Sequence, residues 1–422
     1  MRVLLVGSGG REHALAWGLS HSPHLSDLHA APGNPGIASI ASCHDVPVTD
    51  LEGLTTLALD LRAELVVVGP EAPLVGGLAD RLAAAGIACF GPSAGAARIE
   101  GSKRFAKDLM EAAGVPTARY SVCDTVAAAQ LAIAEAEGNV VIKADGLAGG
   151  KGVFVCSSVA EADDAVAACL VDRRFGGAGA QVLVEERIEG PEVSVLALCD
   201  GQTVAPLAPA RDYKRALDGD RGPNTGGMGA VSPVGGLGDD FVDEIVRTVH
   251  RPVIDELARR GTPFQGCLYA GVMLTVDGPR VLEFNARWGD PETQVIVPRL
   301  HGDLLEALAA AADGRLEGVS LEAGPQSCVT VVLAARGYPD GPEQGAEIEG
   351  VDAAERIEGV TVFHAGTDTR EGRLVVAGGR VLNVSAVGAD VWEARERAYA
   401  AVAEIHFDGM QLRTDIGEGV RV

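Results

Sequence analysis

Short runs of apolar residues alternate with longer segments of mixed polarity over the first ninety residues of the chain. The apolar runs are RVLLV (2–6), LVVV (65–68) and IACFG (87–91). The segments 11–20 and 72–85, which follow the first two runs, are rich in helix-forming residues. Fully apolar strands that alternate with helices are typical of a parallel sheet with helices on both faces. The pattern predicts a doubly wound α/β domain at the N-terminus.

A second series of strands and helices begins near residue 119, after a predicted helix at 102–114 and the segment GVPTA. Its apolar runs are YSVC, VVIK, VFVC and VLVEE, with helical segments at 124–137 and 159–172. A helix-poor stretch with partly alternating polarity then extends to residue 230, as in antiparallel hairpins with one solvated face. The chain is therefore expected to contain several domains.

The remaining third of the chain has a mixed pattern. A long helix is predicted at 239–261, and two strands joined by Asp-Gly follow it, LYAGVMLTV and PRVLEFN. After a helix at 303–313, the last hundred residues combine strands with an amphipathic helix at 390–405. These features predict a small α+β domain at the C-terminus.

The composition limits the partners. The formal net charge of −24 argues against a nucleic acid or an anionic membrane, because both require basic surfaces. It does not exclude a small anion, whose affinity depends on local cations. Eight scattered cysteines without a CxxC pair favour a reduced, cytoplasmic protein without a zinc cluster. The first apolar run is too short for a signal peptide, and no segment is long enough to span a membrane.

The stretch KADGLAGGKG at 143–152 places two lysines among four glycines. Backbone N–H groups of a glycine-rich loop, together with an ammonium group, can surround a phosphate. The stretch is not a P-loop, because Asp145 stands where the first glycine of that motif is required and Gly152 follows the second lysine. We interpret it as a phosphate-binding loop of another kind.

Three glycine-containing loops follow the predicted N-terminal strands. GSGGREH (7–13) opens the first helix, and APGNPG (31–36) and VGPEAP (68–73) follow neighbouring strands. The carboxyl ends of strands in an open α/β sheet share one crevice, so the three loops are expected to line one pocket. Helix N–H groups could bind an anion there, although a tight turn alone would also explain GSGGREH.

The segment VLEFNARWGDPE (281–292) carries polar residues two apart. On a strand, Glu283, Asn285 and Arg287 would project to one face. A carboxylate and a carboxamide supply the oxygen ligands that Mg²⁺ prefers, and arginine offers a forked cation for phosphoryl oxygens. The alternative is the charged outer face of an edge strand.

Two further polar segments allow two interpretations each. VLVEERIEGPE (182–192) is either a solvated strand end or a hinge whose backbone reads a base while one glutamate holds ribose hydroxyls. GPNTGGMG (222–229) is either a donor-rich loop or a hairpin tip. The histidines of HSPH (21–24) are interpreted as surface residues.

Taken in order, these motifs resemble the ATP-grasp superfamily and, within it, the glycinamide ribonucleotide synthetase family. The strings that carry the resemblance extend from residue 4 to residue 367. They are VGSGGREHALAW, APGNPG, VVVGPEAPLV, FGPSAGAARIEGSKRFAKDLM, VIKADGLAGGKGV, GPNTGGMGA, LYAGVM, EFNARWGDPETQ and FHAGT. The resemblance implies two sheets that clamp ATP. The implied divisions are an N-terminal substrate domain (1–101), a linker helix (102–118), a lid subdomain (119–190), a central domain with the metal site (191–324) and a C-terminal domain (325–422).

The resemblance implies an ATP site, and the roles are carried over by matching motifs. The residues implied to bind phosphates are Lys103, Lys143 and the loop residues Gly149, Gly150, Lys151 and Gly152. Those implied at the adenine hinge are Glu185, Glu186 and Ile188, with Glu192 at the ribose. Glu283 and Asn285 match the ligands of Mg²⁺ or Mn²⁺, and Arg287 matches the cation near the transferred phosphoryl group. The strand LYAGVMLTV lacks the further acidic ligand found in many members of the superfamily, so the number of metal ions stays open.

The implied reaction joins glycine to 5-phosphoribosylamine with ATP, giving glycinamide ribonucleotide, ADP and phosphate. The catalytic residues implied are Arg287, Lys143 and Asp290, and Asp290 would face the amine. Residues expected to bind phosphoribosylamine are Gly10, Arg11, Glu12, Asn34, Glu71 and Arg380. Those expected to hold glycine are Asp212 and the loop Asn224–Gly229, which includes Thr225, Gly226 and Gly227. A monomer or weak homodimer is expected.

Parts of the sequence are also compatible with three other functions. The nearest alternative is an ATP-grasp ligase with another carboxylate or amine substrate. A nicotinamide oxidoreductase would need an acidic residue about 20 positions after GSGG, where Asp27 is loosely placed. A non-catalytic nucleotide-binding subunit would not need the combination of Lys143, Glu283, Asn285 and Arg287.

Overall fold

The N-terminal part of the chain folds as a doubly wound domain. The computed structural model describes residues 1–149 and 151–420. A parallel sheet has the order β3-β2-β1-β4-β5. Its strands are β1 (Arg2–Gly7), β2 (Asp27–Pro32), β3 (Ser42–Cys43), β4 (Leu65–Val68) and β5 (Ala88–Phe90). The prediction of a doubly wound parallel sheet is confirmed.

Helices cover both faces of this sheet because alternate residues of each strand enter different cores. Leu4 and Val6 of β1 belong to one apolar core, whereas Val3 and Leu5 belong to another. The helices of the N-terminal segment are α1 (Gly10–Ser20), α2 (Pro35–Ala38), α3 (Leu51–Asp60), α4 (Glu71–Val75), α5 (Leu78–Ala84) and α6 (Ala94–Gly101). Helix α13 (Leu304–Ala312), from much later in the sequence, also packs against β5.

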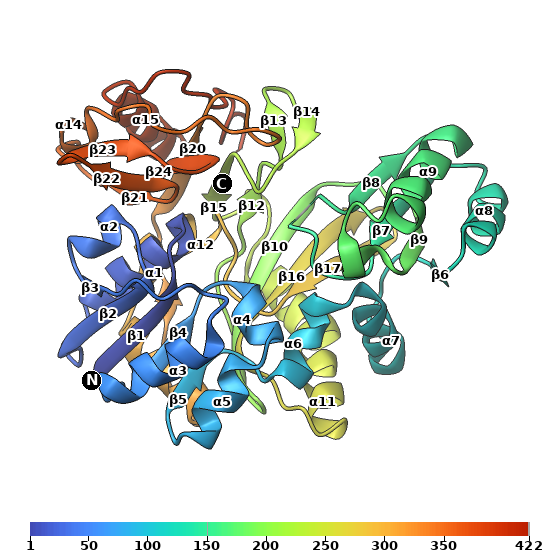
Figure 1. Ribbon diagram of the computed structural model, residues 1–422, viewed down its shortest axis with the longest axis horizontal. Helices are drawn as coiled ribbons and strands as arrows, with labels where there is room; N and C mark the ends of the chain where they lie inside the picture. The colour runs from blue at the N-terminus through green and yellow to red at the C-terminus, as the bar shows by residue number, and fades with distance from the viewer. Residues whose placement is uncertain (150, 421–422) are drawn as a thin grey trace.

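A second, antiparallel sheet lies at the right of Figure 1, away from the N-terminal domain. Its order is β6-β9-β7-β8, and we call it the lid sheet. Its strands are β6 (Tyr120–Cys123), β7 (Val140–Ala144), β8 (Val153–Cys156) and β9 (Val182–Glu186). Its helical segments are α8 (Val126–Glu135), α9 (Val159–Val166), η1 (Ala167–Val171) and η2 (Gly176–Gly179). Helix α7 (Lys103–Ala113) leads into it from the N-terminal domain.

A third sheet forms the centre of the molecule, with the antiparallel order β11-β10-β16-β17. Its strands are β10 (Glu192–Asp200), β11 (Val204–Pro206), β16 (Gln265–Thr275) and β17 (Gly278–Asn285). The helix predicted at 239–261 is α10 (Asp239–Ile245) and α11 (Arg251–Arg259), joined by a π-helical turn, η3 (Val246–His250). We call this sheet the central sheet.

The C-terminal sheet combines distant parts of the chain, with the order β12-β15-β20-β24-β21. Its strands are β12 (Arg211–Asp212), β15 (Gly229–Ser232), β20 (Ser327–Ala334), β21 (Val360–His364) and β24 (Arg380–Gly388). Helix α15 (Val391–Val402) packs against β20 and β24. Strands β12 and β15 come from the later part of the helix-poor stretch, so that part is attached to the C-terminal sheet, whereas its first part forms β10 and β11 of the central sheet. The boundaries predicted between the later domains stay predictions.

The remaining elements are short. They are the hairpins β13 (Arg215–Leu217) with β14 (Arg221–Asn224) and β22 (Thr367–Arg370) with β23 (Arg373–Val376), the strand pair β18 (Leu300–His301) with β19 (Glu322–Ala323), between which α13 intervenes in the chain, and the helical segments α12 (Thr293–Ile296), η4 (Val297–Arg299) and α14 (Val351–Ala354). Within the described residues, no helix combines the length and apolar character needed to cross a membrane.

Candidate active site

The lid sheet and the central sheet meet at Lys143. This residue lies near the end of β7, and its Nζ donates a hydrogen bond of 3.0 Å to the carbonyl oxygen of Leu282 in β17. Leu282 precedes Glu283, so the lysine that begins the glycine loop lies beside the predicted metal ligand. The two motifs singled out in the sequence belong to one site.

Glu185 of β9 lies against two lysines. Its Oε2 is 3.0 Å from Nζ of Lys107 and 3.0 Å from Nζ of Lys143, and the residue is 2 % exposed. Its Oε1 is also buried and has no hydrogen-bond partner among the described residues. A buried carboxylate oxygen without a partner costs free energy that a donor on a ligand would recover. Glu185 therefore presents an acceptor to a ligand.

The predicted adenine hinge is a short connection between sheets. Residues 187–191, which include Ile188, join β9 of the lid sheet to β10 of the central sheet. The carboxylate of Glu186 accepts hydrogen bonds from the N–H and Nε of Arg119 at 2.9 and 2.7 Å and from Arg280 at 3.1 Å. The side chain of Glu186 is thus held by arginines, in contrast to that of Glu185.

The start of α7 is tied to the glycine loop by Asp145. The backbone N–H of Arg104 donates to Oδ1 of Asp145 at 2.7 Å, and Nζ of Lys103 donates to the carbonyl oxygen of Gly146 at 3.2 Å. Burial lowers the pKa of Lys103, and the negative charge of Glu283 acts in the opposite direction. Lys103 therefore belongs to the same group of charges as Lys143 and Glu283.

The rest of the glycine loop reaches toward the C-terminal part of the chain. Nζ of the exposed Lys151 donates to the carbonyl oxygen of Pro339 at 3.3 Å. Gly149 has a φ of +57°, which favours glycine, and a Cβ at Gly152 would lie 2.7 Å from that of Ala148. Gly150, also predicted to bind phosphate, lies outside the described residues.

Glu283 and Glu192 lie on either side of Gly271 on the central sheet, and Lys214 lies between them. Nζ of Lys214 contacts Oε1 of Glu192 at short range and is 3.7 Å from Oε1 of Glu283. A Cβ at Gly271 would lie 3.4 Å from Cγ of Glu283 and 3.7 Å from Oε1 of Glu192. Glu192, predicted at the ribose, is therefore joined through Lys214 to the predicted metal ligand.

Several positive charges act on Glu283. Burial acts to raise the pKa of its carboxyl group, but the nearby cations outweigh burial and lower it. These cations are Lys214, Lys143, Lys103 and Arg287. The side chain is still 37 % exposed, so its ionised carboxylate is accessible to a cation from solution.

Glu283 and Asn285 can supply two oxygen ligands for a divalent ion. Among the described residues, no three or more His, Cys, Asp or Glu side chains form a metal-binding group. Mg²⁺ commonly uses only one or two carboxylates and completes its shell with water and substrate phosphates. Glu283 and Asn285, at the end of β17 beside the lysines, fit an ion of that kind.

Arg287 lies beyond the end of β17, so the expectation that it shares one strand face with Glu283 and Asn285 is wrong. Its NH2 is 2.9 Å from Oε1 of Glu100, and its Nε donates to Oε2 of Glu71 at 3.3 Å. Burial acts to lower its pKa, but both carboxylates raise it overall. Two glutamates of the N-terminal domain thus hold this cation, and Glu100 was not predicted from the sequence.

A glutamate in the first turn of α1, Glu12, bonds to other groups of the chain. Oε2 of Glu12 accepts the N–H of Gly9 at 2.6 Å, and its Oε1 accepts Nε of Arg11 at 2.5 Å. A Cβ at Gly69 would lie 2.0 Å from Oε1 of Glu12, which explains the glycine in VGPEAP. The buried carboxylate of Glu12 is occupied by these contacts, whereas NH1 of Arg11 reaches the carbonyl oxygen of Trp288 at 3.2 Å.

The side chain of Asn34 is also occupied by the protein. Its Nδ2 donates to the carbonyl oxygens of Ser8 and His364, both at 2.8 Å, and its Oδ1 accepts the N–H of Ile37 at 2.9 Å. Asn34 therefore joins two loops of the N-terminal domain to β21 of the C-terminal sheet. Any contact with a ligand would be made by its backbone or would replace one of these bonds.

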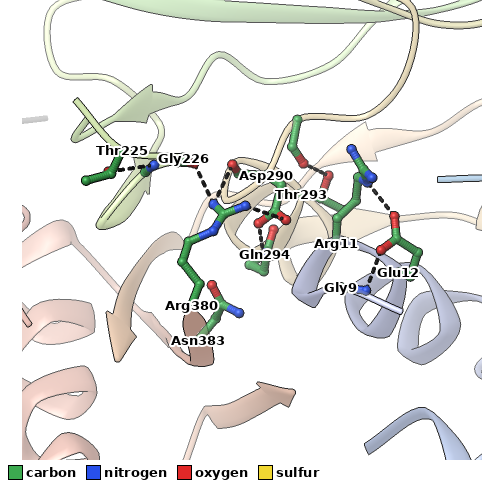
Figure 2. Close-up of polar contacts among 12 residues, drawn as sticks. Gly9, Arg11, Glu12, Thr225, Gly226, Asp290, Thr293, Gln294, Arg380 and Asn383 are labelled. Carbon is green, nitrogen blue, oxygen red and sulfur yellow. Dashed lines mark hydrogen bonds and ion pairs between the residues drawn. The ribbon is translucent and has the colours of Figure 1, made fainter. Parts of the chain in front are cut away.

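Arg380 joins three segments that are distant in the sequence (Figure 2). Its NH2 is 3.0 Å from Oδ2 of Asp290, and its NH1 donates to the carbonyl oxygens of Asp290 and Gly226 at 2.9 and 2.5 Å. Oδ1 of Asp290 accepts Nε2 of Gln294 at 2.7 Å. Asn383, on the same strand as Arg380, lies so close to Gly10 that a Cβ there would be 2.2 Å from its Nδ2.

Asp212 is the second carboxylate with an unused oxygen. Its Oδ1 is buried and has no hydrogen-bond partner within residues 1–149 and 151–420. Burial, and then the charge of Glu292, raise its pKa well above the ordinary value. A Cβ at Gly227 would lie 2.7 Å from this oxygen and 2.4 Å from Cδ of Pro291, so the space beside it is small. Asn224, by contrast, is exposed at the end of β14.

The fold and the site define a class of enzyme. Two antiparallel sheets joined by a hinge, with a lysine of one beside a carboxylate of the other, form the nucleotide clamp of an ATP-grasp enzyme. Family models of phosphoribosylglycinamide synthetase match the N domain at residues 1–100, the ATP-grasp (A) domain at 101–293 and the C domain at 328–419. The chain belongs to the phosphoribosylglycinamide synthetase family.

Individual relatives agree with this membership. The chain is 53 % identical over 419 residues to the phosphoribosylamine–glycine ligase of Streptomyces coelicolor, covering 99 % of this chain and 98 % of the relative. It is 51 % identical to that of Caulobacter vibrioides over 419 residues, with coverages of 99 % and 98 %. These matches confirm the resemblance on which the sequence-based prediction of an ATP-dependent ligase rested.

Solved structures confirm the fold class. The crystal structure of the phosphoribosylamine–glycine ligase from Thermotoga maritima has a TM-score of 0.86 at 35 % identity, covering 98 % of this chain and 100 % of that one. The biotin carboxylase domain of Hydrogenobacter thermophilus 2-oxoglutarate carboxylase has a TM-score of 0.74 at 18 % identity, covering 97 % and 91 %, and shares the fold.

Proposed function

We propose that this chain catalyses the ligation of glycine to 5-phosphoribosylamine with ATP, giving glycinamide ribonucleotide, ADP and phosphate, a step of de novo purine synthesis. The observation that carries this proposal is the group of cations around Glu283. Four cations surround this partly exposed carboxylate: one lysine each from α7, the lid sheet and the segment after β12, and Arg287. Such a group suits a triphosphate and a phosphoryl group in transfer.

ATP lies between the lid sheet and the central sheet in this proposal. Oε1 of Glu185 accepts the exocyclic amino group of adenine, and the backbone of Glu186 and Ile188 faces the base. Glu192 serves the ribose, while the phosphate contacts come from Lys103, Lys143 and the glycine loop with Gly149, Lys151 and Gly152. Glu283 and Asn285 would hold a divalent ion, Mg²⁺ or Mn²⁺, which neutralises phosphate charge when bound.

The two other substrates occupy the side of the site near the C-terminal sheet. The unpartnered oxygen of Asp212 accepts the ammonium group of glycine, and Thr225, Gly226 and Gly227 close a space too small for a side chain. Phosphoribosylamine lies near Arg11, Glu71 and Arg380, at the N-terminus of α1, where helix N–H groups favour a phosphate. Asp290, oriented by Arg380, faces the amine.

The chemistry follows from the reactants. A carboxylate is a poor electrophile, so ATP first converts glycine to glycyl phosphate, and the ribosylamine nitrogen then attacks the acyl carbon and expels phosphate. Arg287, held by Glu71 and Glu100, neutralises charge near the transferred group. The glycine loop excludes water from the acyl phosphate. No nucleophilic side chain is needed.

The test is a coupled assay of ADP formation in which each substrate is omitted in turn. ADP release should require both glycine and phosphoribosylamine. Equal turnover with bicarbonate or formate in place of glycine would overturn the proposal and favour another ATP-grasp ligase. A cytoplasmic location and a monomer or weak homodimer are parts of the proposal that separate measurements must address, as they must the number of metal ions.

A further inference from the structure

Lys107 is a buried lysine that the proposed mechanism does not use. It lies in the middle of α7 and is 2 % exposed, although a helix at the surface normally keeps its lysines in solvent. Its Nζ is 3.0 Å from Oε2 of Glu185 and donates to Oγ1 of Thr117 at 2.9 Å and to the carbonyl oxygen of Ala118 at 3.2 Å. Every proton of the ammonium group thus has an acceptor.

These contacts attach Lys107 to both sheets of the clamp. Glu185 belongs to β9 of the lid sheet, and Oγ1 of Thr117 donates to the carbonyl oxygen of Val281 in β17 of the central sheet at 2.6 Å. Lys107 therefore fixes the position of Glu185 relative to the central sheet. The ring of Tyr120, 5.3 Å from the ammonium group, covers it on another side.

The arrangement also fixes which oxygen of Glu185 is free. Both Lys107 and Lys143 contact Oε2, and Oε1 remains buried without a partner in the part of the chain that the structure describes. Both ammonium groups donate to Oε2, so Oε1 is the oxygen left to accept a hydrogen bond from a ligand. A ligand atom placed beside it gains free energy if it is an N–H donor and loses free energy if it is a carbonyl oxygen.

We propose that Lys107 is a positioning residue that holds Glu185 with Oε1 facing the ligand as an acceptor and so makes the nucleotide site select a 6-amino purine over a 6-oxo purine. This inference rests on the proposed placement of ATP. Lys143 also contacts Oε2 of Glu185 and donates to the carbonyl oxygen of Leu282 in the central sheet, but in the proposed function its ammonium group serves the phosphates, whereas Lys107 has no other role.

The test compares ATP and ITP, which differ at the 6-position of the purine, by titration calorimetry on the full chain with Mg²⁺. The wild type should bind ATP about 30-fold more tightly than ITP. ITP lacks the amino group that donates to Oε1 of Glu185 and places a carbonyl oxygen, which is repelled, in its position. Lys107→Met should reduce this ratio to about threefold, mainly by weakening ATP. Glu185→Gln, whose amide can donate, should also reduce the ratio and should strengthen ITP.

Thr117→Val, which retains the charge of Lys107 but removes one of its acceptors, is the milder variant if Lys107→Met does not fold, and it should lower the ratio severalfold. Arg104→Met, at an exposed position of the same helix, is the matched control and should leave the ratio unchanged. If Lys107→Met and Thr117→Val, in so far as they fold, keep the wild-type ratio of ATP affinity to ITP affinity, the inference is overturned while the proposed function stands. If the wild type binds neither nucleotide, the proposed ATP site itself fails.

Discussion

Arg380 and Asp290 form an ion pair of 3.0 Å that joins the C-terminal sheet to the segment after β17. The guanidinium group is 20 % exposed and also binds the carbonyl oxygen of Gly226. Burial acts to raise the pKa of Asp290, but the charge of Arg380 lowers it overall, so the carboxylate is ionised. One arginine thus orients both the predicted catalytic aspartate and the loop at Gly226, beside which glycine is proposed to bind.

Replacing this arginine should affect one substrate more than the others. In Arg380→Met we expect kcat/KM for phosphoribosylamine to fall about 30-fold, since the loss of a charged hydrogen bond costs about 2 kcal/mol. The dissociation constant of ATP, measured by calorimetry, should stay within a factor of two or so of the wild-type value. Arg370→Met, at an exposed position of the same part of the chain, is the control. Equal weakening of ATP would contradict the assigned role.

Glu283→Gln tests the metal site. Because the side chain is partly exposed and packs on no core, we expect the melting temperature to change little and turnover at saturating ATP to fall about 100-fold. The concentration of Mg²⁺ needed for half-maximal activity should rise by about tenfold or more. Glu322→Gln, an exposed glutamate on β19, should match the wild type in both measurements. An unchanged Mg²⁺ requirement would remove Glu283 from the site.

Gly227→Ala tests the space beside Asp212. The new Cβ would lie 2.4 Å from Cδ of Pro291 and 2.7 Å from Oδ1 of Asp212, so the loop or the carboxylate must move. We expect the KM for glycine to rise about tenfold or more, while ATP binding is retained. Backbone strain also contributes, because φ is +108°. Gly236→Ala isolates that contribution, since its φ is +78° and no atom lies within 4 Å of the new Cβ. A similar rise in both variants would point to strain alone.

The sequence contained enough information for the strands and for the loops that follow them. Apolar runs and glycine clusters are local signals, and they located β1, β4, β7 and β17 and the glycine loop that follows Lys143. Single charged residues on helices carry no such signal, because a buried lysine and a solvated one look alike in sequence. Lys107 and Glu100 were missed for this reason, and only the packing of α6 and α7 against other segments reveals their contacts.

Contacts between segments that are distant in the sequence also could not be predicted from local sequence patterns. The pairing of β15 with β20 carries Asp212 and the loop before Gly229 into the C-terminal sheet, and no local pattern encodes that pairing. Lys214 lies between Glu192 and Glu283 as a consequence. The substrate contacts of Glu12 and Asn34, expected from the resemblance, stay predictions, and the protein partners of both side chains could not be predicted from a loop motif.

The contact between α1 and β21 should make the protein sensitive to acid. Nδ1 of His13 accepts the backbone N–H of His364 at 2.8 Å, which a doubly protonated ring cannot do. Burial, and then the charge of His364, lower the pKa of His13 from 6.5 to about 3, and burial lowers that of His364 to about 4. Between pH 6.5 and these lower pKa values, the unfolded chain binds more protons than the folded chain. The contribution of the two histidines to the free energy of unfolding is therefore present above pH 6.5 and is lost as the pH falls.

Urea unfolding at pH 8 and pH 5 measures the effect. For His13 alone, the free energy of unfolding should drop by about 2 kcal/mol between the two pH values. His13→Asn keeps an acceptor for the N–H of His364 and does not titrate. Its free energy of unfolding should therefore drop by about 2 kcal/mol less than that of the wild type between pH 8 and pH 5. His21→Asn, at an exposed position just after the same helix, should drop as the wild type does. If His13→Asn loses as much stability in acid as the wild type, the α1–β21 contact is not the acid-sensitive element, and other buried groups, such as His250 with its pKa of about 4, become the ones to replace.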